Sequence, residues 1–206
     1  MSGRRPDDLT TKIIHGRVDG EALSRFEYDC FFLMLALAGN ETTRTVTSNA
    51  MLLLIEHPEH RRMLLDDMSL LPGTIEECLR YRPAVIHFRR TATRDLVMRG
   101  KTIREGDKVT VWYPSANRDE EVFEEPDRFD IRRSVNEHLA FGVGEHFCLG
   151  ASLARLQLLA IFETLLPRLP DMELAGPVRR LRSNFIDGIK EMPVCFTPQP
   201  GDGRDR

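Results

Sequence analysis

The most informative segment of this chain is Phe141-Gly142-Val143-Gly144-Glu145-His146-Phe147-Cys148-Leu149-Gly150. Its glycines carry no side chain, so the backbone can pass close to a flat group and turn sharply there. Cys148 comes just before a predicted helix, whose dipole and free backbone N–H groups stabilise a thiolate. A single cysteine is more often an ordinary buried residue, but that interpretation leaves the glycine spacing and His146 unexplained. The segment therefore predicts a bound cofactor with Cys148 as its ligand.

Composition limits the other possibilities. The 206 residues are 41% hydrophobic and 30% charged, with a formal net charge of -3, which is typical of a soluble globular domain and gives no indication of binding to nucleic acid or anionic lipid. The four cysteines lie far apart, so we expect a reducing, cytoplasmic setting. The longest apolar run, residues 31–38, is too short to cross a bilayer, and residues 1–8 lack the apolar core of a signal peptide.

Hydrophobic periodicity and turn residues predict a mainly α protein with a small antiparallel β part. Helices are expected at about 24–56, 57–68, 72–82 and 149–166, the first of them capped by Ser24 with Glu27 three residues on. A small sheet is expected at about 85–113, a charged irregular meander at about 117–135, and short strands at 171–197. One domain covering residues 1–206 accommodates all of these elements.

The pattern F-G-x-G-x-H-x-C-x-G at residues 141–150 strongly resembles the haem-binding loop of the cytochrome P450 family of haem-thiolate monooxygenases. Three further segments match that family in its order, namely Ala38-Gly39-Asn40-Glu41-Thr42-Thr43, Glu77-Cys78-Leu79-Arg80 and Pro126-Asp127-Arg128-Phe129. The resemblance implies the C-terminal half of the P450 fold. The likeness is greatest to soluble actinobacterial members that act on sterol side chains and branched lipids.

By this resemblance Cys148 is the proximal ligand of the iron of haem b, and Phe141 shields its sulfur. Gly142 and Gly150 let the loop backbone approach the cofactor. His146 and Arg90 match positions that bind the haem propionates, which suits cationic side chains. The alternative for each is an ordinary surface charge, and for His146 taken alone the two interpretations are about equal.

The resemblance assigns the other side of the haem to the long helix. Glu41 and Thr42 match an acid and alcohol pair that delivers protons during oxygen activation, and Ala38 is small enough to let the helix approach the haem. Without the motif, Thr42 would be interpreted as a hydroxyl bonded back to a helix carbonyl.

Glu77, Arg80 and Arg128 match a buried network of one acid and two arginines that holds the meander in place. By spacing alone, Glu77 and Arg80 are an ordinary i,i+3 helix pair worth tenths of a kcal/mol.

The expected function is hydroxylation of a small lipophilic substrate, such as a sterol or branched lipid, with O₂ and electrons from a ferredoxin or flavin reductase. Family members are much longer, so we expect the N-terminal half to be missing and to be supplied by a second chain or lost from a gene fragment. The alternative is a catalytically inactive truncated product or interaction module with weak haem binding. A zinc site built from His138, His146 and Cys148 is disfavoured because these ligands do not form two close pairs.

Overall fold

The structure is a computed structural model and describes residues 8–134 and 136–197. The ends of the expected domain, residues 1–7 and 198–206, and the last residue of the expected meander, Val135, lie outside the described residues. The chain divides into two compact units, Met1–Glu41 and Thr42–Arg206, and the longest helix, α2 (Arg25–Glu56), crosses the boundary between them.

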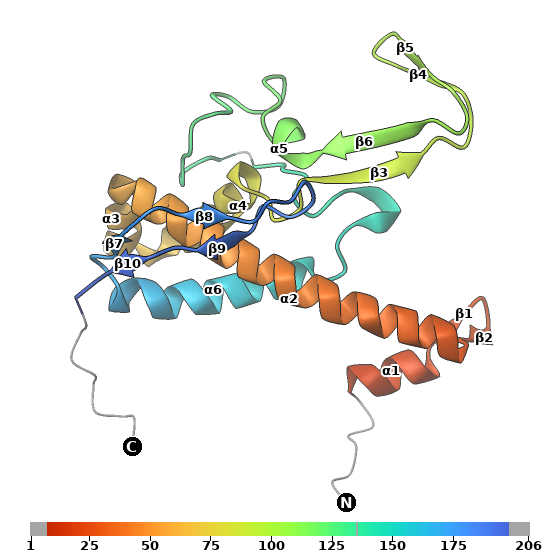
Figure 1. Cartoon of the computed structure of the whole chain (residues 1–206), viewed down its shortest axis with the longest axis horizontal. Helices are drawn as coiled ribbons and strands as arrows, with labels where there is room; N and C mark the ends of the chain where they lie inside the picture. Colours follow the sequence, from red (N-terminus) through yellow and green to blue (C-terminus); the bar gives the residue numbers. More distant parts are fainter. Residues whose placement is uncertain (1–7, 135, 198–206) are drawn as a thin grey trace, which may run out of the picture. The chain divides into compact units, whose positions relative to one another are not determined.

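The first unit contains a short helix, a two-residue strand pair and the beginning of α2. These elements are α1 (Leu9–His15), β1 (Arg17–Val18) and β2 (Glu21–Ala22) (Figure 1). The expected capping box of α2 is confirmed, because the Ser24 N–H donates to the Glu27 carboxylate at 2.8 Å and the Glu27 N–H donates to Ser24 Oγ at 3.3 Å. Residues 31–38 form an apolar run in which Leu33, Met34 and Leu37 are more than half exposed.

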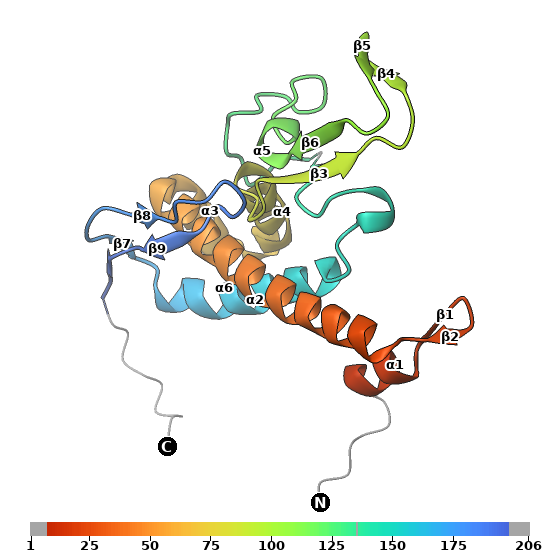
Figure 2. The same ribbon diagram turned by 45° about the vertical axis from the view of Figure 1, so that its right-hand side comes forward.

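The second unit holds four helices that supply its core. They are the C-terminal half of α2, α3 (Pro58–Asp66), α4 (Leu71–Tyr81) and α6 (Ala151–Arg168) (Figure 2). Every buried residue of α2 lies after Glu41, in the part of the helix that belongs to this unit. In α4 the buried apolar stripe follows the helical repeat through Leu71, Ile75, Cys78 and Leu79, which is the pattern of a helix packed on one face.

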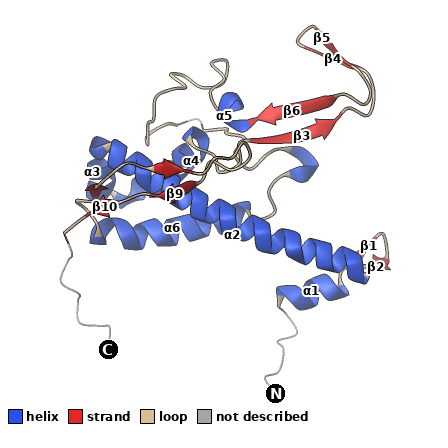
Figure 3. Cartoon of the chain, viewed as in Figure 1, coloured by secondary structure: helices blue, strands red, loops and turns tan. Residues whose placement is uncertain are grey.

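The strands are short, antiparallel and arranged in pairs (Figure 3). The described strands of the second unit are β3 (His87–Thr91), β4 (Leu96–Met98), β5 (Lys101–Ile103), β6 (Lys108–Trp112), β7 (Glu173–Leu174), β8 (Arg179–Arg180), β9 (Ile189–Glu191) and β10 (Val194–Cys195). Among them, β3 pairs with β6, β4 with β5, β7 with β10 and β8 with β9. A one-turn helix, α5 (Tyr113–Ala116), follows β6. The mainly α architecture with small antiparallel sheets agrees with the fold class predicted from the sequence.

Two helix ends differ from the expected positions. The last long helix starts at Ala151 rather than near 149, because Gly150 takes the N-cap position. It continues to Arg168 beyond Pro167, where the Leu169 N–H still bonds to the Leu165 carbonyl at 3.0 Å. Cys148 therefore lies two residues before the N-cap, and the Ala151 N–H donates to its carbonyl oxygen at 3.2 Å.

A polar contact joins the C-terminal hairpin to α2 inside the second unit. The fully buried Asn49 donates from Nδ2 to the Asp187 carbonyl at 2.9 Å, and Arg180 donates to the Asp187 carboxylate at 2.9 Å. Since a buried amide without a partner costs about 1–3 kcal/mol, this pairing fixes the turn between β8 and β9.

Of the helices in the described ranges, none has the length and apolar character required to cross a membrane.

Candidate functional site

The glycine-rich loop at residues 141–150 folds back on itself. Gly142 and Gly144 have φ values of 73° and 75°, in the left-handed region that side chains disfavour. The Cys148 N–H donates to the Phe141 carbonyl at 2.9 Å, and the Gly142 N–H donates to the Leu139 carbonyl at 2.8 Å. The two bonds close the loop and bring the backbones of Phe141 and Cys148 together, although seven positions separate them.

The Cys148 thiol is presented at the surface of this loop. Its residue is partly exposed and unbridged, and a Cβ placed on Gly150 would lie 4.0 Å from the sulfur. Three neighbouring apolar side chains are also exposed: Val143 at 72%, Phe147 at 52% and Leu149 at 79%. A soft thiol donor within an exposed apolar rim suits a large apolar metal cofactor such as haem.

Tyr113 joins the loop to the strand pair β3–β6. A Cβ on Gly142 would lie only 3.3 Å from the Tyr113 hydroxyl oxygen, so the loop passes this ring closely. Burial raises the pKa of Tyr113, and the positive charge of Arg90 on β3 partly offsets that rise. Arg90 therefore lies within electrostatic reach of the residue that touches the loop. Its side chain is exposed, as is that of His146 in the short 3-10 turn Gly144–His146.

The acid and arginine pair on α4 is completely buried. Arg80 donates from Nε and Nη2 to both oxygens of Glu77 at 2.7 and 2.8 Å, and neither side chain is exposed to solvent. The remaining Arg80 donors reach meander carbonyls, namely those of Asn117 at 2.9 Å, Pro126 at 2.8 Å and Arg128 at 3.0 Å. The pair thus holds α4 to the meander. Its burial and its contacts with three carbonyls distinguish it from the exposed helix pair that spacing alone suggests.

Arg128 enters this network differently from the sequence interpretation. Its guanidinium is 58% exposed and pairs with Glu125 at 2.9 Å, so only its backbone carbonyl contacts Arg80. The second arginine at the buried acid is Arg133, whose Nε donates to Glu77 at 3.2 Å and whose side chain is 10% exposed. Sequence reasoning missed Arg133, because the matched motif ends before it and a charged loop residue has no periodicity to indicate burial.

A second charged cluster is centred on Glu76, the neighbour of Glu77 on α4, and was not predicted. Glu76 accepts from Arg155 Nε and Nη2 at 2.7 Å each, and the His138 ring lies 3.1 Å from the same carboxylate. Burial raises the pKa of Glu76, but the hydrogen bonds from Arg155 and His138 outweigh it and lower the pKa to about 2. The cluster therefore keeps a carboxylate ionised close to the loop. Since both ring nitrogens of His138 have partners, this residue has no free nitrogen for a zinc ion.

The predicted residues of the long helix divide between the two units. Ala38 and Glu41 belong to the first unit, and both are exposed. Thr42 is the first residue of the second unit and is partly buried. Its neighbour Thr43 lies 3.5 Å from Gln157 of α6 through side-chain oxygens, which places this turn of α2 beside α6.

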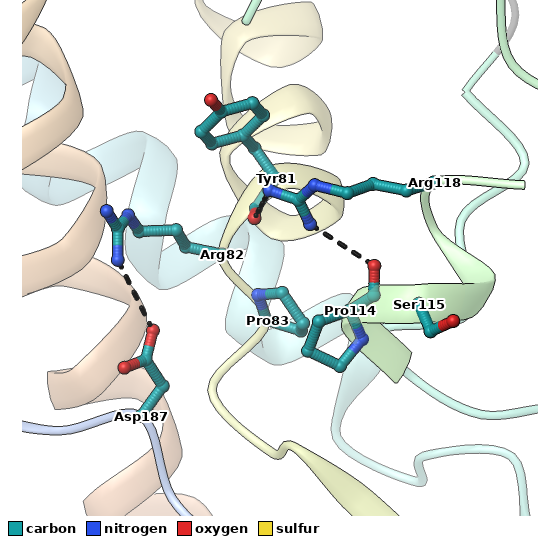
Figure 4. Close-up of a pocket in the computed structure, with 7 residues that line it drawn as sticks. All are labelled: Tyr81, Arg82, Pro83, Pro114, Ser115, Arg118 and Asp187. Carbon is teal, nitrogen blue, oxygen red and sulfur yellow. Dashed lines mark hydrogen bonds and ion pairs between the residues drawn. The ribbon is translucent and has the colours of Figure 1, made fainter. Parts of the chain in front are cut away.

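A pocket in the second unit lies away from this loop. It has a volume of about 490 Å³ and is lined by Tyr81, Arg82, Pro83, Pro114, Ser115, Arg118 and Asp187 (Figure 4). Arg118 uses its donors on the carbonyls of Pro114 and Tyr81 and on the Asp127 carboxylate, so it holds the pocket wall together. None of the residues predicted for haem binding or catalysis lines this pocket. The candidate site is therefore the exposed loop surface around Cys148.

Comparison with known proteins shows the family of the chain. The family model described as Cytochrome P450 matches residues 2–170. A methyl-branched lipid omega-hydroxylase of Mycobacterium tuberculosis is 45% identical over 93% of this chain and 45% of its own length. A steroid C26-monooxygenase of Mycolicibacterium smegmatis is 43% identical over 93% of this chain and 48% of its own length.

Solved structures give the same result. Substrate-free CYP109E1 from Bacillus megaterium superposes with a TM-score of 0.89 at 36% identity, covering 94% of this chain and 51% of that chain. Mycobacterium marinum CYP268A2 in complex with pseudoionone gives 0.87 at 42% identity, covering 92% and 46%. The chain spans about half the length of these relatives. The fold, the loop and these similarities together show that the chain belongs to the cytochrome P450 family.

Proposed function

We propose that this chain carries the proximal half of the haem site in a haem-thiolate monooxygenase that hydroxylates a lipophilic substrate with O₂. The observation that carries the proposal is the closed loop in which the Cys148 N–H bonds to the Phe141 carbonyl and leaves the thiol partly exposed within an apolar rim. Such a loop holds one thiolate in a fixed orientation, which an iron ligand requires.

The cofactor we propose is haem b, with the Cys148 sulfur on its iron. When bound, haem supplies oxygen activation, which a thiolate ligand promotes by donating electron density. We assign to Phe141 the role of limiting access of water to the sulfur. Arg90 and His146 are exposed cations suited to the two propionates, and Gly142 and Gly150 keep the loop surface free of side chains that would hold the porphyrin away.

The long helix would serve the opposite side of the site. Glu41 and Thr42 are adjacent on α2 and provide a carboxylate and a hydroxyl, the groups that relay protons from solvent. Ala38 lies one turn before Thr42 on the same helix and has the smallest chiral side chain, so it leaves room above a porphyrin. We assign proton delivery to Glu41 and Thr42 and close packing to Ala38.

The names of the similar proteins support the substrate class that we propose. The two curated relatives are named for hydroxylation of a methyl-branched lipid and of a steroid at C26. We propose a substrate of the same chemical class, a sterol or branched lipid, and a ferredoxin or flavin reductase as electron donor. Activity would need the portion of the relatives that this chain does not match, whether it lies in the same protein or in a second chain.

Spectroscopy of the haem-reconstituted chain tests the assignment. The reduced protein treated with carbon monoxide should show the strongly red-shifted Soret band of thiolate ligation. Cys148→Ala should abolish that band, whereas Cys195→Ala, which removes an exposed thiol elsewhere, should leave it unchanged. Persistence of the band in Cys148→Ala would exclude Cys148 as the ligand.

The second candidate function is a non-catalytic product or interaction module. It is favoured by the exposed apolar run of α2, where Phe32, Leu33 and Met34 are 49%, 60% and 66% exposed. Apolar surface of this kind commonly marks a contact with another protein segment. Haem content after reconstitution and gel filtration separates the candidates, because the module requires no stoichiometric haem.

A further inference from the structure

We propose that Glu76, Arg155 and His138 form a proximal clamp that positions Phe141 and, through it, the Cys148 loop. The clamp is thus a set of positioning residues on the protein side of the loop, outside the family motifs matched in the sequence. The inference rests on the proposed function only in its last step, the effect on haem ligation. The steps before it concern the folded chain alone.

Three segments of the chain converge on one carboxylate. Glu76 lies on α4, Arg155 lies on α6, and His138 comes directly before the loop. The two bonds from Arg155 to Glu76, 2.7 Å each, form a bidentate pair of the strongest type among protein side chains. The side chains of Glu76, Arg155 and His138 are 27%, 36% and 2% exposed. A pair that is two-thirds shielded on both sides is held more firmly than a surface ion pair.

Two hydrogen bonds determine which ring nitrogen of His138 donates. The Ala140 N–H donates to His138 Nδ1 at 3.2 Å, so this nitrogen is the acceptor. Nε2 therefore carries a hydrogen, lies 3.1 Å from the Glu76 carboxylate and donates to it. One ring thereby joins α4 to the backbone at Ala140, immediately before Phe141. The loop entrance is tied to the helix by a directional contact at each nitrogen.

Contacts with the Phe141 ring connect the clamp to the loop itself. The Arg155 guanidinium lies over the Phe141 ring at 4.6 Å from its centroid, within the range of a cation–π contact. The rings of His138 and Phe147 flank the same side chain, with centroids at 6.0 and 6.4 Å from that of Phe141. The Phe141 ring is therefore contacted by the Arg155 cation and by two aromatic rings, while its carbonyl accepts a hydrogen bond from the Cys148 N–H.

Charge supports this geometry. The hydrogen bonds to Glu76 raise the pKa of Arg155, and its electrostatic interaction with Cys148 acts in the same direction. The clamp cation is thus permanently ionised and lies within electrostatic reach of the sulfur. A carboxylate on its far side keeps the guanidinium oriented, so that its flat face remains on Phe141.

Hydrogen exchange of the full chain without haem tests the clamp directly. The reporters are the amides of Gly142 and Cys148, whose bonds close the loop. In Arg155→Met we expect both amides to exchange about tenfold faster than in the wild type, because local opening no longer breaks the guanidinium contacts. Glu76→Gln keeps the shape of the carboxylate and should show the same direction of change. The matched control is Arg99→Met, which breaks an equally bidentate but exposed arginine–glutamate pair.

The second measurement uses the haem-reconstituted chain. We expect the clamp variants to lose at least half of the red-shifted carbon monoxide Soret band, while Arg99→Met retains it. Unchanged exchange of the two amides in both clamp variants would refute the inference. Faster exchange with an unaltered Soret band would refute the positioning role and leave only a structural one. If the wild type binds no haem, the proposed function fails, and the exchange experiment still decides whether the clamp holds the loop.

Discussion

The buried pair Glu77 and Arg80 allows the sharpest prediction about stability. Arg80→Met removes a side chain with no solvent exposure and leaves the Glu77 carboxylate buried without its bidentate partner. It also leaves the carbonyls of Asn117, Pro126 and Arg128 without this donor. Breaking a buried ion pair by removing one partner costs about 3–5 kcal/mol.

The structure favours the upper part of that range. The Asp130 N–H, Asn136 Nδ2 and Arg133 Nε still donate to Glu77 at 2.9, 3.1 and 3.2 Å. Only Arg133 among them carries a charge, and its one contact does not replace the two shorter charged bonds from Arg80. Typical domains have free energies of unfolding of about 5–15 kcal/mol, so the variant should lose a large share of its stability. With a urea m value of about 2 kcal/mol/M, the midpoint should fall by about 1.5–2.5 M.

Urea unfolding measured by the fluorescence of Trp112 provides the assay. The matched control is Arg128→Met, the same substitution at a guanidinium that is 58% exposed. Because exposed pairs contribute about 0–1 kcal/mol, this control should change the midpoint by less than about 0.5 M. A loss under 1 kcal/mol in Arg80→Met, or equal losses in the two variants, would show that the buried network does not hold the meander.

Three further outcomes are expected. The folded pKa of Glu76, about 2, lies below its ordinary value of 4.5, so its stabilisation is complete above about pH 4.5 and is lost as the pH falls toward 2. Between pH 6 and pH 3 the shift corresponds to a loss of about 2 kcal/mol before solvent screening. Because the side chain is 27% exposed, urea unfolding at the two pH values should show Glu76→Gln losing roughly 1 kcal/mol less than the wild type. Gly142→Ala should destabilise the protein by roughly 1–3 kcal/mol, and by more than Gly144→Ala. Both glycines have positive φ, but only a Cβ added at Gly142 would have a neighbour within 4 Å. Thermal unfolding measures the difference, and equal losses of stability in the two variants would contradict the prediction. Burial raises the pKa of the Cys78 thiol, so a thiol reagent should modify Cys78 roughly a hundredfold more slowly than the exposed Cys195 until the chain unfolds, as peptide mass analysis would show.

Local patterns in the sequence were sufficient for much of this protein. The glycines at 142 and 144 predicted a sharply turning loop, and both have positive φ. Helical periodicity predicted α4 and the long helix, and the Ser24–Glu27 spacing predicted its cap, because these features depend on residues within one or two turns of each other. The motif order predicted the P450 family and the mainly α fold, which the comparisons and the element order confirm.

Only the tertiary structure decided which charges meet. Glu76 contacts His138 across 62 positions and Arg155 across 79, and no spacing rule connects residues so far apart in the chain. Arg133 rather than Arg128 reaches Glu77 for the same reason, since the path of an irregular meander is set by what it packs against and not by periodicity. Local chemistry therefore determined the elements and the glycine-rich loop of this protein, whereas the packing of α4 against α6 determined the contacts around that loop.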